Sequence, residues 1–155
     1  MKGGLFDLIF IMAMLMILGI GIYVSSYVLD QLPTFESEST TNVLANSRTA
    51  LDTFNYGFAI IAVGMGLAAV VMAYLLPSHP IMIVAGIIML VFVMIIAPQI
   101  SNAFGVFIAN ENMATQASHF NILNYIMANL PLFLAAFGTM MLIALYMKGS
   151  RGVSY

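Results

Sequence analysis

Few side chains in this sequence could do chemistry, and their spacing does not bring them together into a reactive site. The histidines are His79 and His119, and neither has Asp, Glu or another His at the spacing of metal ligands. The chain has no cysteine, which excludes thiol nucleophiles and cysteine-ligated metals. We find no nucleophile–base pair, no carboxylate dyad and no glycine-rich phosphate loop. We therefore expect a protein that is not an enzyme, with no catalytic residues, no metal site and no cofactor.

Asp7 is the charged residue nearest to the interior of an apolar stretch. A carboxylate deep in a membrane would indicate a proton or cation site, because burying a charge in lipid is costly. Asp7 lies close to the start of the stretch and close to Lys2, which favours a carboxylate that reaches the membrane interface. No other charge lies deep in an apolar stretch, and this argues against coupled transport.

The composition defines the class of protein. Hydrophobic residues make up 63% of the chain and charged residues 6%, whereas a soluble domain is about half apolar and about a quarter charged. Such a chain cannot cover a water-facing surface, so its apolar surface must face lipid. With four basic and six acidic residues, it also lacks the basic footprint of a nucleic-acid-binding protein.

Four apolar stretches are long enough to cross a bilayer as helices, which takes about 20 residues for about 30 Å of hydrocarbon. They span about 5–29, 54–76, 80–100 and 126–147. None alternates in polarity as a membrane strand does. We predict an all-α integral membrane protein with four transmembrane helices. It forms a single transmembrane domain over 1–155, with polar outer loops at 30–53 and 101–125.

The basic residues predict the orientation. Four spans place Lys2, Lys148 and Arg151 on one side of the membrane and Arg48 on the other. Cytoplasmic loops carry the excess of Lys and Arg, so we expect a multi-pass protein that is N-in and C-in, in a cell membrane or a viral membrane. The first stretch is too long for the apolar core of a cleavable signal peptide, and we expect it to be a retained helix.

The second and third helices are expected to form an antiparallel hairpin. The turn between them is only Pro77-Ser78-His79-Pro80. Residues 40–56 contain no Pro or Gly, so the second helix is expected to begin near Ser39, and residues 101–112 can continue the third. The hairpin then extends beyond the bilayer. Its expected outer contacts are Leu44, Leu51, Phe104 and Phe107.

Two prolines and an amphipathic segment complete the pattern. Pro98 is expected to kink the third helix near the membrane boundary. Residues 114–129 carry apolar side chains at helical spacing, and this segment is expected to lie on the outer interface before Pro131 opens the last span. The apolar side chains are Phe120, Leu123, Ile126 and Met127.

Small residues gather on the second helix, and small residues let membrane helices approach closely. The candidates for helix packing are Gly57, Gly64, Gly66 and Ala68. The sequence leaves open whether they pack inside the protein, against other copies, or both. Neutral polar residues near the outer boundary are expected to cap helices and bond between them, in preference to lining a channel vestibule. They are Gln99, Ser101, Asn102, Asn110, Asn112 and Asn129.

Three short motifs resemble those of small multi-pass membrane proteins from lipid-containing viruses and related proviruses. They are Ser78-His79-Pro80, the run from Ala97 to Phe104, and Asn129-Leu130-Pro131-Leu132. The resemblance covers roughly residues 54–147. It implies a virion membrane component that helps to shape the vesicle or to bind it to the capsid. It assigns no functional residue.

From these observations we expect a structural membrane protein. Its expected partners are the lipid bilayer and either copies of itself, as a homo-oligomer, or other membrane or capsid proteins. An accessory subunit of a larger membrane complex is the first alternative. A holin-like or channel-forming protein is the second, and the lack of a polar stripe along any span disfavours it.

Overall fold

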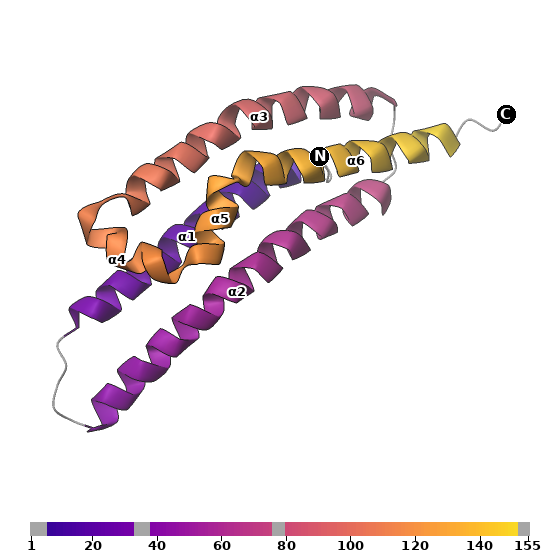
Figure 1. Ribbon diagram of the computed structural model, residues 1–155. Helices are drawn as coiled ribbons and strands as arrows, with labels where there is room; N and C mark the ends of the chain where they lie inside the picture. Colours follow the sequence, from indigo (N-terminus) through magenta and orange to yellow (C-terminus); the bar gives the residue numbers. More distant parts are fainter. Residues whose placement is uncertain (1–5, 33–37, 76–79, 152–155) are drawn as a thin grey trace.

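The computed structural model describes residues 6–32, 38–75 and 80–151, and these are almost entirely helical (Figure 1). The helices are α1 (Phe6–Gln31), α2 (Glu38–Leu75), α3 (Pro80–Ile108), α4 (Glu111–His119), α5 (Asn121–Ala128) and α6 (Leu130–Arg151). Four of them, α1, α2, α3 and α6, are long and apolar enough to cross a membrane. The predicted all-α fold with four candidate transmembrane helices is therefore confirmed.

The long helices form a bundle in which α6 lies between α2 and α3 (Figure 1). The most extensive contacts of α2 and of α3 are with α6, and α1 packs mainly on α2. Although α2 and α3 run antiparallel, their pairing with each other is not among the extensive contacts of the described residues. α6 therefore lies between the two helices of the expected hairpin. The turn residues Pro77, Ser78 and His79 lie outside the described residues.

The helix bounds agree with the expected extension of the second helix and differ for the third. Because α2 has 38 residues, it is about 57 Å long at 1.5 Å per residue. α3 continues through Pro98 and is bowed along its length, but it ends at Ile108 (Figure 1). Asn110 then starts α4, and its side chain accepts a hydrogen bond from the backbone N–H of Asn112 at 3.1 Å. This is the usual role of Asn at a helix N-cap.

The segment at 114–129 differs from its expected place on the outer interface. It forms parts of two short helices, α4 and α5, which pack against α1, α2 and α3 inside one end of the bundle. The four side chains of its apolar face are buried, and they are Phe120, Leu123, Ile126 and Met127. The segment has the predicted amphipathic pattern, but its apolar face packs inside the protein.

Beside α4 and α5, the interior of the bundle is filled by large side chains that come from different helices. Tyr23 of α1, Phe58 of α2, Phe104 of α3 and Phe120 at the junction of α4 and α5 are all at most 1% exposed. The ring of Tyr23 meets the rings of Phe104 and Phe120 edge-on, with centroids 5.7 and 5.3 Å apart. These aromatic contacts fix the long helices around α4 and α5.

α1 is offset along the bundle relative to α6. Leu8, near the start of α1, lies beside Gly138 near the middle of α6, and Figure 1 shows α1 beginning at that height. At its other end, α1 packs against α2, α4 and α5, and Asp30 there contacts Arg48 of α2 and Gln116 of α4. The half-buried Asp7 therefore lies near the height of the middle of α6.

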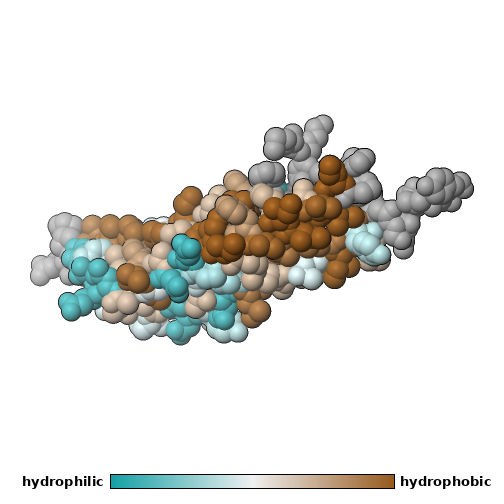
Figure 2. Space-filling view, turned by 90° about the horizontal axis from the view of Figure 1, so that it is seen from above, coloured by the Kyte–Doolittle hydropathy of each residue, from teal (hydrophilic) through white to brown (hydrophobic). Residues whose placement is uncertain are grey.

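The two ends of the bundle differ in chemistry. We call the end that carries Asp30, Arg48 and α4 the polar end, and Figure 2 shows hydrophilic side chains gathered there beside a long apolar surface. We call the other end, where α6 finishes, the basic end, because α6 carries Lys148 and Arg151 there. Between these ends the surfaces of α2, α3 and α6 are dominated by exposed large apolar side chains.

Exposed tyrosines lie at two heights along this apolar surface. Tyr56 and Tyr125 are near the polar end, and Tyr74 and Tyr146 are near the basic end. Tyr56 and Tyr74 lie five turns apart on α2, which is about 27 Å at 1.5 Å per residue. This separation is close to the hydrocarbon thickness of a bilayer, about 30 Å. Tyrosine is one of the residues that gather at the two membrane interfaces.

Candidate functional site

Four polar side chains gather where α4 meets α5, inside the polar end of the bundle, and three of them are buried while Asn124 is half-buried. We call Tyr23, Asn55, Gln116 and Asn124 the polar cluster. They come from α1, α2, α4 and α5, so the cluster joins four helices. A buried polar group costs free energy unless it is hydrogen-bonded, and the partners of each residue therefore indicate what the cluster does.

Asn55 bridges the break between α4 and α5. Its side-chain oxygen accepts a hydrogen bond from the backbone N–H of Leu123 at 3.1 Å, and its amide nitrogen donates to the backbone oxygen of His119 at 3.5 Å. The N–H groups in the first turn of a helix have no partner within the helix. Phe120 occupies the N-cap position of α5 and provides no side-chain hydrogen bond. Asn55 therefore acts as the cap of α5 from a different helix.

Tyr23 and Asn124 form a second link. The Tyr23 hydroxyl donates a hydrogen bond to the side-chain oxygen of Asn124. The amide nitrogen of Asn124 donates to the backbone oxygen of Ala117 at 2.7 Å. The oxygen and the nitrogen of the Asn124 amide are thus both hydrogen-bonded. Through these two bonds Asn124, on α5, links α1 to α4.

Gln116 connects α4 to the end of α1. It is 4% exposed, and its amide nitrogen donates to a carboxylate oxygen of Asp30 at 2.8 Å. The other carboxylate oxygen of Asp30 lies 3.0 Å from a guanidinium nitrogen of Arg48 on α2. One atom of this group, the side-chain oxygen of Gln116, is buried without a hydrogen-bond partner. The chain of contacts ties α4, α1 and α2 together at the polar end.

A small cavity of about 90 Å³ lies beside this chain of contacts. It is lined by Ser26, Asp30, Arg48, Leu51, Asp52 and His119. Asp30 and Arg48 neutralise each other across it, and His119 is exposed at the end of α4. Among the residues that the structure describes, no group of three or more His, Asp or Glu side chains is placed to hold a metal ion.

Ser101 of α3 compensates for a proline in the following span. Its hydroxyl lies 2.8 Å from the backbone oxygen of Met127 and 2.9 Å from that of Ala128, so its proton serves these carbonyls in turn. In a continuous helix the oxygen of Met127 would accept from the N–H of residue 131, but Pro131 has none. Ser101 therefore supplies a donor at the position where the proline removes one.

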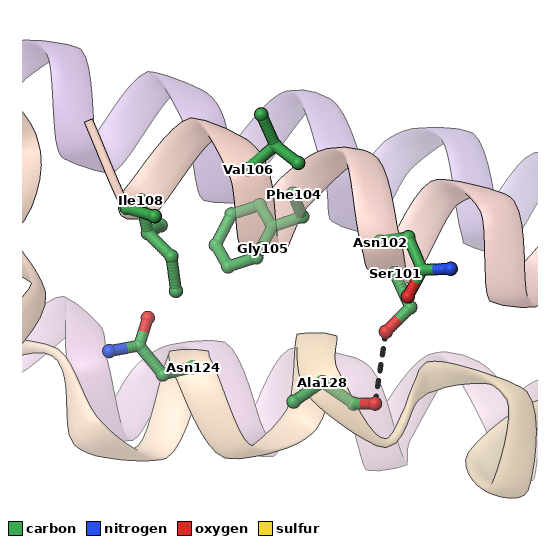
Figure 3. A pocket seen from close by; sticks show the side chains of 9 residues that line it. Ser101, Asn102, Phe104, Gly105, Val106, Ile108, Asn124 and Ala128 are labelled. Atoms are coloured by element: carbon green, nitrogen blue, oxygen red, sulfur yellow. Dashed lines mark hydrogen bonds between the residues drawn. The ribbon is translucent and has the colours of Figure 1, made fainter.

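An open groove of about 490 Å³ lies next to this contact, between α3 and α5 (Figure 3). Its lining is mostly apolar and includes Phe104, Val106 and Ile108, while Asn124 and Ser101 face it from opposite sides (Figure 3). Both polar groups are engaged in the hydrogen bonds described above. The groove therefore offers mainly apolar surface. Ser101 joins α3 to α5, Asn124 links α1 to α4, and Asn102 is a third polar residue of the lining.

The predicted helix-packing residues divide between two faces of α2. Gly66 is buried, and a Cβ atom there would lie 2.6 Å from the ring of Phe137 on α6. Gly64 and Ala68 are exposed, and Gly57 is half-buried. A Cβ atom on Gly57 or Gly64 would meet nothing within 4 Å. Within one chain, close packing on α6 thus uses Gly66, and the other three glycine or alanine positions face outward or lie at the edge.

The predicted outer contacts also divide. Phe104 is 1% exposed and belongs to the aromatic core, and the ring of the half-buried Phe107 lies 6.0 Å from that of Tyr23. Leu51 is half-buried between α1 and α2 and lines the cavity at the polar end. Leu44 is half-buried nearer the start of α2. Phe104, Phe107 and Leu51 therefore belong to or pack against the hydrophobic core of the bundle.

Sequence reasoning found some of the polar residues and missed others. The expected capping and interhelical roles are found in three residues. Ser101 bonds between helices, Asn110 caps the start of α4, and Asn129 bonds to Tyr125 at the end of α5. Asn55, Gln116, Asn124 and Tyr23 were not singled out. The available signal was a polar residue among apolar neighbours, as in Phe54-Asn55-Tyr56, since such a residue in an apolar helix usually has a partner on another helix.

Comparisons with known proteins give this chain no family and no function. No protein-family model, no curated protein and no solved structure matches this chain.

Proposed function

We propose that this chain is a structural, non-catalytic membrane protein that works by packing against copies of itself or against neighbouring proteins. The observation that carries the proposal is the hydrogen bonding of the buried and half-buried polar side chains. Asn55, Asn124 and Ser101 all bond to backbone groups of another segment. These polar groups hold the helices in place, so the outer surface of the bundle is the part that contacts other molecules.

The outward face of α2 supports lateral packing. Gly64 and Ala68 lie one helical turn apart and are both exposed, with Ile61 on the same face. Small residues at this spacing let two membrane helices approach closely, which is a main source of association in lipid. The bundle interior is already filled by aromatic side chains, so this face is available to a second molecule.

The membrane location and orientation are part of the proposal. The tyrosine levels near Tyr56 and Tyr74 support a bilayer between them. Lys148 and Arg151 on α6 favour a cytoplasmic basic end, while the polar end stands outside. The motifs around Ala97 and Asn129 favour a viral membrane as the setting, where the polar end would meet a capsid or the inside of the virion.

Cysteine cross-linking tests the packing face directly, because the natural chain has no cysteine. We expect Gly64→Cys and Ala68→Cys to give disulfide-linked dimers in native membranes. Ala85→Cys, an exposed alanine on the outer side of α3, is the matched control and should stay monomeric. Equal cross-linking at Gly64 and Ala85 would show that the contact is random collision, and would contradict a specific face.

The mass of the native assembly separates the alternatives. Native mass spectrometry from mild detergent should give a homo-oligomer, and Gly64→Leu should shift it toward monomer because a bulky side chain separates close helices. A fixed complex with unlike chains would make the protein an accessory subunit. Conductance of the purified homo-oligomer in planar bilayers would show that the protein forms a channel, and would contradict a purely structural role.

A further inference from the structure

Two amide side chains of α3 face outward near the polar end of the bundle. Gln99 and Asn102 lie three residues apart on one exposed face of this helix. Within the described part of the chain, neither amide takes part in a hydrogen bond, unlike the hydroxyl of the neighbouring Ser101. α3 is also the least buried of the four candidate spans, with 17% of its most apolar part buried against 28–39% for the others. This side of α3 is therefore open, and it is not purely apolar.

A backbone oxygen on the same face lacks its usual donor. Pro98 lies inside α3, and a proline has no N–H for the oxygen of the residue four positions earlier, which is Met94. Pro98 is exposed, so this oxygen lies on the outward side of the helix. Ser101 offsets the same loss at Pro131 within the chain. Among the described residues no side chain does so for Met94.

These polar groups lie at or inside the tyrosine level of the polar end. Ser101 lies beside Ala128, which follows the exposed Tyr125 by three residues toward the basic end. Because α3 runs toward the polar end, Gln99 and Met94 lie deeper than Ser101 in the proposed bilayer. Acyl chains offer no hydrogen-bond donor or acceptor, and an unsatisfied polar group among them costs free energy. A partner that brings donors and acceptors to this face is therefore favoured over lipid.

We propose that this face of α3 binds the same face of a second copy of the chain, amide against amide. We call it the amide face and define it by Pro98, Gln99, Asn102 and Val106. An amide carries a donor and an acceptor of opposite partial charge, so two like amides are complementary. Two copies with the same orientation in one membrane bring the same residues to the same height. A two-fold contact then places Gln99 and Asn102 opposite their own counterparts.

This contact rests on the proposed function and adds a second interface to the one that contains Gly64 and Ala68 on α2. Because α6 lies between α2 and α3, the two interfaces are on different sides of the bundle (Figure 1). A molecule that uses one of them is free to use the other. Copies joined alternately through α2 and α3 form a row in the membrane that extends beyond a dimer.

Cysteine cross-linking of the purified full chain in liposomes tests the amide face. Val106 lies one turn from Asn102 and is 76% exposed, so Val106→Cys leaves both amides in place. We expect this variant to form disulfide-linked dimers. Leu132→Cys, at a 70% exposed position on α6, is the matched control and should stay largely monomeric. Equal cross-linking at the two positions would show random collision and would overturn the contact.

Removal of the amides should weaken the contact. In the Val106→Cys background, Gln99→Leu or Asn102→Leu should raise the dissociation constant of the dimer about three- to thirty-fold, which corresponds to about 0.6–2 kcal/mol for an interhelical hydrogen bond. The cross-linked fraction at different protein-to-lipid ratios measures this change. Both positions are exposed, so leucine should leave the bundle folded. Unchanged dimerisation of the double variant would overturn the pairing of the amides.

Gly64→Cys separates this contact from the proposed function, because it reports on the α2 interface. Its cross-linking should persist with Gln99→Leu and Asn102→Leu, which also shows that these variants fold. Gly64→Cys combined with Val106→Cys should give a ladder of species larger than a dimer, and a product that stops at the dimer would overturn the row. Cross-linking at Gly64 without cross-linking at Val106 would overturn the amide face alone. Failure at both positions would overturn the proposed function as well.

Discussion

The side-chain oxygen of Asn55 on α2 accepts a hydrogen bond from the backbone N–H of Leu123 on α5, at 3.1 Å across 68 positions of the chain. The same amide reaches back to the last carbonyl of α4, at His119. One buried side chain thus serves both sides of a helix break. The path of the chain from α4 into α5 depends on a residue of a distant helix.

Asn55→Leu should destabilise the protein, because it removes both hydrogen bonds and leaves two backbone groups unpaired. We expect a loss of about 1–3 kcal/mol in the free energy of unfolding, as for a buried group that loses its partner. Denaturation by SDS in mixed micelles measures it. Asn46→Leu, at an exposed position of the same helix, is the control and should change little. Equal effects of the two substitutions would show that Asn55 does not cap α5.

The pair Ser101 and Pro131 should show thermodynamic coupling. Ser101→Ala removes the donor to the carbonyls of Met127 and Ala128, and we expect a loss of about 1 kcal/mol. Pro131→Ala restores an N–H group four residues after Met127. In the double variant the effect of Ser101→Ala should therefore be smaller than in the natural background. A double-mutant cycle measures the difference, and strict additivity would contradict the compensation.

Gly66 and Gly64 should respond in opposite directions to alanine. At Gly66 the new Cβ atom would lie 2.6 Å from the Phe137 ring, and overpacking of this kind costs about 1–3 kcal/mol. At Gly64 the Cβ atom meets nothing within 4 Å, and alanine favours the helix by roughly 0.5–1 kcal/mol over glycine. Thermal unfolding in detergent, at a protein concentration where the chain is monomeric, separates the two. Loss of stability in Gly64→Ala under those conditions would contradict the outward placement.

Asp30 should matter more through Gln116 than through Arg48. The ion pair is partly exposed, with side chains 40% and 54% exposed for Asp30 and Arg48, and pairs of that kind contribute about 0–1 kcal/mol. Arg48→Gln should therefore have a small effect that fades with salt. Asp30→Ala also leaves the buried Gln116 amide without its acceptor, so we expect a loss of about 1–3 kcal/mol. Unfolding of both variants at low and high salt checks the order, and a larger effect for Arg48→Gln would reverse it.

The sequence by itself determined the number, type and length of the long elements. Each of the four long helices contains a continuous apolar run long enough to cross a bilayer, and in lipid a single chain would have few ways to satisfy its backbone other than a helix. The sequence also predicted the polar first half of α2, because residues 40–56 have apolar side chains at helical spacing and contain no Pro or Gly. The caps and polar contacts of Ser101 and Asn110 followed from residue type near the helix ends.

Only the tertiary structure decided which face of each span turns inward and which helices are neighbours. The spans are apolar all round, so the contrast between a buried and an exposed face that guides the reading of soluble helices is missing. Gly64 and Gly66 are both glycines in the same apolar stretch, yet only a Cβ atom added at Gly66 would meet the ring of Phe137. The position of α6 between α2 and α3, and the burial of α4 and α5, depend on contacts such as Asn55 with Leu123. Those contacts join residues far apart in the chain, and no local pattern encodes them.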